Sequence, residues 1–225
     1  YRRQRQMCIR DSVHMEFLSY LISGISLGSV YAIIALGYTM VYGIAKMLNF
    51  AHGDVIMVGA YIILTCITRG GMSPILAVIL SVVICTLLGV VIEKVAYSPL
   101  RKASSNLAVL ITAIGVSYFL QNAAQLLWGA TPKNFTSLVT FQVPEFLAKF
   151  NVSAVSLVTI VACLVIMAGL MFFTGKTKMG KAMRAVSEDK AAAQLMGINV
   201  NRTISMTFAI GSALAAIAGV LLCSY

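Results

Sequence analysis

Stretches of about 20 mainly apolar residues recur along the whole chain. A run of that length crosses about 30 Å of hydrocarbon as a helix, whereas a strand of a membrane barrel needs only about 10 residues. Charged residues make up 11% of the chain, against about 25% in soluble domains, and the mean hydropathy is +0.91. We therefore predict an all-α fold, a polytopic transmembrane helical bundle in one domain.

The apolar runs predict where the helices lie, and the second run is unusual. It is short for a crossing, so we expect a tilted, re-entrant or broken helix near 47–68. In the first run, Gly24 and Gly28 have the GxxxG spacing of closely packed membrane helices. The predicted segments are Phe17–Ile44, Val55–Thr68, Pro74–Ile92, Leu107–Trp128, Val152–Phe173 and a last span from Ile204.

The charges predict the topology. The net charge is +10, and the basic residues fall between apolar runs, so they do not indicate a nucleic-acid partner. Two spans separate the basic loops 94–102 and 175–202, which therefore lie on one side, and the positive-inside rule makes that side cytoplasmic. The loop Gly129–Asn151 then faces outward. The N-terminus starts outside if the segment after Asp54 crosses fully, and inside if it is re-entrant.

The two chain ends differ from the body. Residues 1–14 hold four arginines and one aspartate and lack the apolar core of a signal peptide. We interpret them as a non-native or disordered tail and assign 15–225 to the transmembrane domain. The chain stops at Tyr225 directly after an apolar run, which favours a truncated C-terminus.

A polar island interrupts the apolar sequence after the first span. It contains Asn49, His52 and Asp54, and a charge at the membrane centre costs about 2.5–3.5 kcal/mol on insertion scales. His52 and Asp54 are two positions apart and lie on different helical faces, which argues against a catalytic pair. We interpret the island as a helix break.

A polar stripe runs along the predicted helix 107–128. Gln121 and Gln125 are one turn apart, Ser117 lies one turn earlier, and Asn122 is adjacent. Such a stripe serves either hydrogen bonding between helices or a ligand path, and in both cases it avoids lipid.

A short helix is predicted in the basic loop 175–202. Ser187 is its expected N-cap, Glu188 and Asp189 favour the positive end of its dipole, and Gly197 ends it. Its body, Lys190–Met196, is small and partly apolar and is marginal alone. Docking on the spans and docking on a cytoplasmic partner are equally favoured.

The chain has few groups suited to chemistry. Its five cysteines are scattered and form no CxxC pair, so we expect packing roles and no metal. No GxxxxGK[ST] loop is present to bind phosphates, and no acid/base dyad stands out. We expect no cofactor and no enzymatic activity in this chain, and any ATP hydrolysis belongs to partners.

Four separated blocks closely resemble the permease of branched-chain amino acid ABC transporters, namely Gly24–Gly43, Asn49–Asp54, Ala113–Asn122 and Met179–Asn199. The resemblance implies an importer subunit of the bacterial inner membrane. It also implies a second similar permease subunit, two cytoplasmic ATP-binding subunits and a periplasmic solute-binding protein. The loop helix then resembles the coupling helix that contacts the ATPase.

These interpretations select two groups of residues. We expect Asn49, His52, Gly53, Asp54, Gln121 and Asn122 beside the substrate pathway. We expect the ATPase coupling residues to be Glu188, Asp189, Ala191, Ala192 and Gly197. The alternatives are a urea or short-amide permease of the same family and, from another class, a secondary transporter or channel without an ATPase. A membrane enzyme ranks last.

Overall fold

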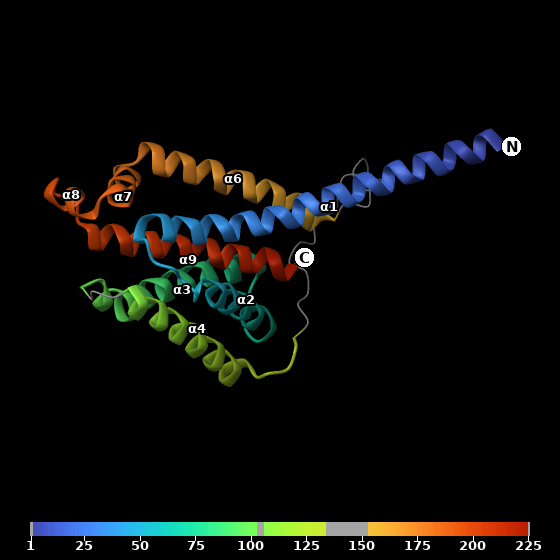
Figure 1. The fold of residues 1–225 in the computed structure, drawn as a ribbon. Coiled ribbons are helices and arrows are strands. Elements are labelled where there is room, and N and C mark those ends of the chain that lie inside the picture. Colours follow the sequence, from blue (N-terminus) through green and yellow to red (C-terminus); the bar gives the residue numbers. More distant parts are fainter. Residues whose placement is uncertain (1, 103–105, 134–152, 225) are drawn as a thin grey trace.

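The computed structural model describes residues 2–102, 106–133 and 153–224, with backbone alone for 2–15, 102 and 106. All regular structure in these ranges is helical, which confirms the predicted all-α bundle (Figure 1). The elements are α1 (Arg2–Ala45), α2 (His52–Thr68), α3 (Pro74–Ile92), the π-helix η1 (Glu93–Tyr97), the 3-10 helix η2 (Pro99–Lys102), α4 (Asn106–Trp128), α6 (Ala154–Lys176), α7 (Lys178–Glu188), α8 (Lys190–Leu195) and α9 (Val200–Ser224).

Five helical segments of the described chain are long and apolar enough to span a membrane. They are Glu16–Ala45, Pro74–Tyr97, Leu107–Trp128, Ala154–Lys176 and Val200–Ser224. The sixth apolar helix, α2, has 17 residues and reaches about 25 Å, the lower limit for a crossing. The predicted segments and the short second helix are thus confirmed.

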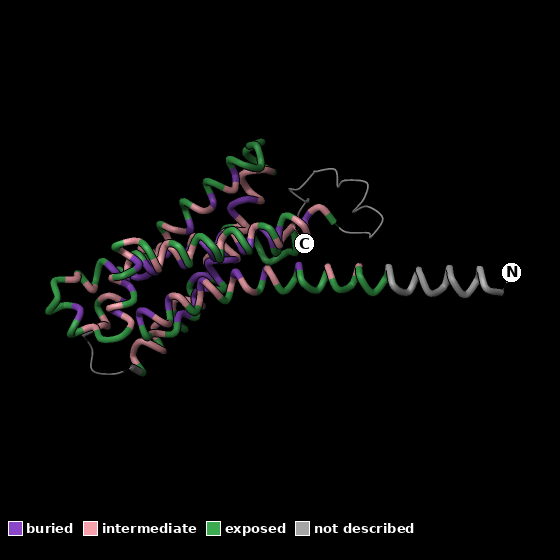
Figure 2. Tube along the Cα trace, turned by 90° about the horizontal axis from the view of Figure 1, so that it is seen from above, coloured by how far each residue is buried: buried purple, intermediate pink, exposed green. Residues whose placement is uncertain are grey.

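Helix α9 forms the centre of the bundle. In its most apolar stretch 67% of the residues are buried, whereas the other four long helices reach 17–28%. Small residues allow this close packing: a Cβ on Gly219 would lie 2.6 Å from the Ile56 carbonyl oxygen, and one on Gly211 would lie 2.7 Å from Val41 Cγ2. Elsewhere, the outward faces of the helices are exposed (Figure 2).

Helix α2 connects the two ends of the bundle. We call the end that carries η2, α7, α8 and the start of α9 the basic end. Helix α1 finishes there, since Lys190 Nζ donates a 2.7 Å hydrogen bond to the Ala45 carbonyl. Helix α2 finishes at the opposite end, where Trp128 of α4 donates to Thr65 Oγ1 at 2.7 Å. Helix α2 therefore runs away from the basic end, and α1 begins at the end opposite the basic end (Figure 1).

Gly24 and Gly28 meet no other helix within the described part of this chain, so their expected role in helix packing stays a prediction. Both are exposed, and a Cβ on either would meet nothing within 4 Å. The close approaches occur instead at α9, because that helix has neighbours on most sides. Spacing alone predicts a small-residue face without saying whether another helix covers it.

Three details at the basic end differ from the predictions. Glu93, the residue directly after the predicted span Pro74–Ile92, is fully buried, because η1 continues the helix to Tyr97. The loop 175–202 contains a second helix, α7. Ser187 lies inside α7 and donates to the Arg184 carbonyl, so Asp189 caps α8 instead, accepting from the backbone N–H groups of Ala191 and Ala192.

Two predictions fall largely outside the described residues. Of the predicted loop Gly129–Asn151, residues 134–151 are not described, and side chains are not described in the predicted tail, residues 1–14. Both assignments stay predictions.

Candidate functional site

The backbone between α1 and α2 is broken inside the bundle. We call residues 46–54 the α1–α2 break. Lys46 has φ +55, a left-handed conformation that is uncommon for a residue with a side chain, and it ends α1. Ala51 occupies the N-cap position of α2 and provides no side-chain hydrogen bond. The first turn of α2 therefore presents backbone N–H groups that no capping side chain satisfies.

Asn49 is buried in the break and is held from η1. Tyr97 donates its hydroxyl to Asn49 Oδ1 at 3.1 Å, and the Tyr97 ring packs on Phe208 of α9 with centroids 5.4 Å apart. The π-helical turn extends α3 far enough for Tyr97 to reach the break. Sequence patterns do not point to Tyr97, because residues 94–102 follow an apolar run and are predicted to form a loop.

His52 is buried against α1. Its ring meets Tyr38 edge-on at 6.0 Å, and a Cβ on Gly37 would lie 3.0 Å from His52 Cε1. Glycine at position 37 thus makes room for the imidazole. His52 Nε2 is buried without a hydrogen-bond partner among the described residues.

Asp54 joins the break to α4. Gln121 Nε2 donates to Asp54 Oδ1 at 3.1 Å and also lies 3.2 Å from Ser117 Oγ, so the predicted face of α4 turns toward the break. Asp54 Oδ2 is buried without a hydrogen-bond partner within the described ranges. Gly53 is exposed. Asn122 differs from the rest, because its amide donates to the Tyr118 carbonyl of its own helix.

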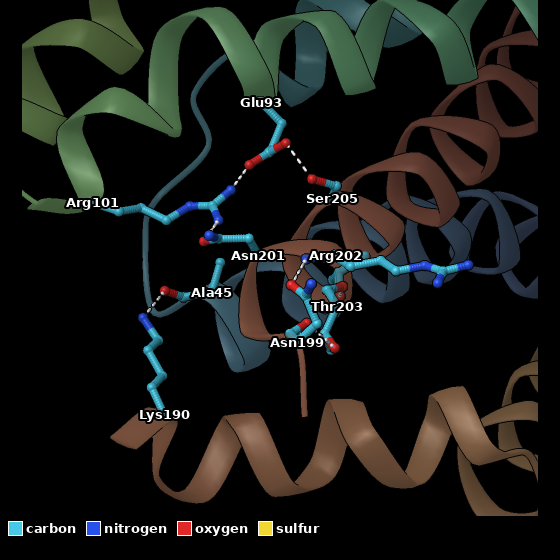
Figure 3. A network of polar contacts seen from close by, with 10 residues as sticks. Ala45, Glu93, Arg101, Lys190, Asn199, Asn201, Arg202, Thr203 and Ser205 are labelled. Carbon is cyan, nitrogen blue, oxygen red and sulfur yellow. Dashed lines mark hydrogen bonds and ion pairs between the residues drawn. The ribbon is translucent and has the colours of Figure 1, made fainter. Parts of the chain in front are cut away.

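A second polar network joins η1, η2 and α9 at the basic end (Figure 3). Buried Glu93 forms an ion pair with Arg101 and accepts a 2.6 Å hydrogen bond from Ser205. Arg101 also donates to Asn201 Oδ1 at 2.7 Å, and burial lowers the pKa of its guanidinium. We call Glu93, Arg101, Asn201 and Ser205 the basic-end network. The sequence feature that could have indicated this network is Glu93, a single acidic residue directly after an uncharged span.

Lys190 ties α8 to the end of α1. Its ammonium points toward the Ala45 carbonyl, one residue before the break, whereas Arg202 points away from the network (Figure 3). Burial lowers the pKa of Lys190, and the positive charges of Arg101 and Lys46 lower it further. Three cations therefore lie close enough to repel one another.

Helix α8 is short but well terminated. Asp189 caps its start, and Gly197, with φ +83, ends it: the Ile198 N–H bonds the Ala193 carbonyl and the Gly197 N–H bonds the Gln194 carbonyl. This is the Schellman arrangement, so the predicted glycine stop is confirmed. Ala193 is buried, and the exposed residues in and beside this helix are Glu188, Asp189, Ala191, Ala192, Gln194, Leu195, Met196 and Gly197.

Within the described ranges, no three His, Cys, Asp or Glu side chains are grouped to hold a metal ion. The polar groups of the break are amide, imidazole, carboxylate and phenol. They can donate and accept hydrogen bonds or balance one charge.

Comparisons with known proteins identify the family. The model of the family described as "Branched-chain amino acid transport system / permease component" matches residues 20–225. The chain belongs to this family. The high-affinity branched-chain amino acid permease protein BraD of Pseudomonas aeruginosa is 41% identical over 218 residues, which is 92% of this chain and 71% of that protein. LivH of Escherichia coli K12 is 41% identical over 219 residues with the same coverage.

More distant relatives exist in the same family. A probable LivH permease protein of Methanocaldococcus jannaschii is 29% identical over 202 residues, covering 86% of this chain and 62% of that protein. No solved structure matches the chain. Since the relatives are permease components and five described helices can span a membrane, this permease is a multi-pass membrane protein.

Proposed function

We propose that the chain is the permease subunit of an ABC importer in the bacterial inner membrane and moves branched-chain amino acids inward by alternating access. The relatives named for this transport support the substrate class. The partners are a second homologous permease, two cytoplasmic ATP-binding subunits and a periplasmic solute-binding protein. The basic end then faces the cytoplasm, in agreement with the positive-inside rule.

The broken span supports the proposal most directly. Discontinuous helices near the membrane midplane form the substrate sites of many transporters. In the first turn of α2 the His52 N–H bonds the Asn49 carbonyl, and the uncapped N–H groups of Gly53 and Asp54 that follow are suited to a substrate carboxylate. The unpaired Oδ2 of Asp54 is suited to the α-ammonium group. Gly53 is exposed and lacks a side chain, so a ligand can approach its backbone.

The remaining pathway residues have supporting roles. Gln121 orients the Asp54 carboxylate, and Asn49 holds the break to η1 through Tyr97. Asn122 makes its contact within α4, so it lines the pathway with its exposed side chain and orients no other member.

Helix α8 is the proposed contact with the ATPase. Leu195 is 89% exposed and Met196 82%, next to the exposed Ala191 and Ala192, and this apolar tip lies at the extreme of the molecule (Figure 1). Asp189 and Gly197 set the start and end of the helix, and Glu188 precedes it. Lys190 links the helix to the α1–α2 break, which provides a route from ATPase to pathway.

Uptake into vesicles that contain the whole transporter tests the proposal. We expect leucine accumulation to require ATP inside and the binding protein outside. Leu195→Glu places a charge in the apolar contact, and we expect the ATPase to be lost on purification and uptake to fall about tenfold or more. Leu195→Met keeps the apolar surface and should retain both. Uptake without ATP would indicate a secondary transporter or channel instead.

A further inference from the structure

A cleft of ≈ 1140 Å³ opens at the basic end, between the start of the α1–α2 break and the Arg101 and Asn201 side of the basic-end network. Its walls come from the end of α1 and the start of the break, from η2, from the start of α4, and from α8 with its connection to α9. The cleft therefore lies where several membrane helices end, at the depth of the lipid headgroups.

The charged residues of the cleft all have one sign. Lys46, Arg101 and Lys190 line it, and no aspartate or glutamate does among the described residues. Buried Glu93, which does not line the cleft, forms an ion pair with Arg101. The positive charges of Lys46 and Lys190 have no such counter-charge within the described ranges. The Lys190 ammonium donates one of its three N–H groups to the Ala45 carbonyl, which leaves two N–H groups for a ligand. The Lys46 ammonium has no partner in the described structure.

The rest of the lining is mixed in polarity. Tyr42, Leu48 and Leu107 present exposed apolar surface at the cleft, and Asn199 and Gln194 add amide groups. The occupant that fits is an amphipathic anion: its charge meets the lysines and its apolar part meets the exposed aliphatic and aromatic side chains.

We propose that this cleft binds the phosphate headgroup of an anionic phospholipid from the leaflet at the basic end. Basic pockets between helices at a cytoplasmic membrane surface attract such headgroups. A zwitterionic amino acid fits less well, because the lining offers its ammonium group no carboxylate. Burial lowers the pKa of Lys190, the nearby charges of Arg101 and Lys46 lower it further, and a bound anion would offset both effects.

Such a lipid would bridge elements that have to move together. Lys46 starts the α1–α2 break, Lys190 belongs to α8, and Arg101 belongs to η2. One headgroup in contact with all three would hold α8 against the break. This inference does not depend on which substrate is transported.

Lipid binding to the purified transporter tests the inference. The full chain is purified in detergent with its copurifying subunits and titrated with dioctanoyl-phosphatidylglycerol, dioctanoyl-phosphatidylcholine or inorganic phosphate at constant ionic strength, with binding followed by native mass spectrometry. We expect the anionic lipid to bind most tightly. Lys46→Gln with Lys190→Gln should weaken it about thirtyfold, since each lysine contributes about a factor of five near such a surface.

Matched variants make the result specific. Lys178→Gln with Lys181→Gln removes two charges from α7, outside the cleft, and should change affinity by less than about twofold because of screening. Lys46→Arg with Lys190→Arg keeps both charges and should retain binding, which separates loss of charge from loss of fold. Equal binding of the two lipids, or equal weakening by both glutamine pairs, would overturn the inference. Phosphate binding as tightly as the anionic lipid would identify a free-anion site instead.

Discussion

The α1–α2 break and the basic-end network both bury ionisable groups among helices, but they differ in how completely these groups are paired. Glu93 is fully buried and meets Arg101 and Ser205. Asp54 is 7% exposed and has a partner on one carboxylate oxygen only. A buried polar group costs free energy unless it is paired. Pairing offsets the cost of burying Glu93 and Arg101, so the bundle depends on both being present, and the half-paired break keeps acceptor capacity for a ligand.

The largest expected effect comes from breaking the paired network. Glu93→Ala leaves the Arg101 guanidinium buried without its counter-charge, and we expect the free energy of unfolding to fall by about 3 kcal/mol. Denaturation in mixed micelles measures the change. Adding Arg101→Met removes the orphaned charge and should restore at least about half of the loss. If Glu93→Ala alone lowers the free energy of unfolding by less than about 1 kcal/mol, the basic-end network does not differ from the break in its importance for stability.

Asp54→Asn tests the half-paired region with an intermediate effect. The new amide oxygen can still accept from Gln121, so we expect stability and complex assembly to change little. Uptake should fall about tenfold or more, equivalent to about 1.4 kcal/mol, because the charge that faces the substrate ammonium is lost. Vesicle uptake and copurification of the partner subunits measure the two properties. Unchanged uptake would exclude Asp54 from the mechanism.

Asn122→Ala should have the smallest effect among the proposed pathway residues. Its amide bonds the carbonyl of its own helix, and removing it leaves no other side chain of the described structure unpaired. We expect uptake to change by less than about twofold, within the usual range of surface substitutions. A loss as large as that of Asp54→Asn would show that Asn122 contacts the substrate directly.

Sequence patterns located the break and selected Gln121, but they did not show that Gln121 pairs with Asp54, and they missed Tyr97. Asn49, His52 and Asp54 stand out because polar groups are costly within an apolar run. Tyr97 and Gln121 lie 48 and 67 positions away from the residues they bind, and only helix packing brings them there. Glu93 and Arg101 resembled ordinary charges flanking a span, and one additional helical turn in η1 converts them into a buried pair.

The two possible N-cap residues of α8 show that a neighbouring helix determines which residue becomes the cap. Ser187 and Asp189 are both favourable N-cap residues. Helix α7 extends through Glu188 and takes Ser187 into its own last turn, so the cap falls to Asp189. The glycine stop was predictable, because Gly197 adopts a positive φ that other residues avoid.

The sequence by itself determined the membrane-spanning class, the approximate helices, the short second span and the polar break, because these follow from the length and polarity of continuous segments. Tertiary structure decided that α9 is the central helix, that Gly24 and Gly28 face no other helix of the described chain, and which buried charges are paired. The physical reason is that hydropathy acts along the chain. Burial and pairing depend instead on which helix faces meet in space.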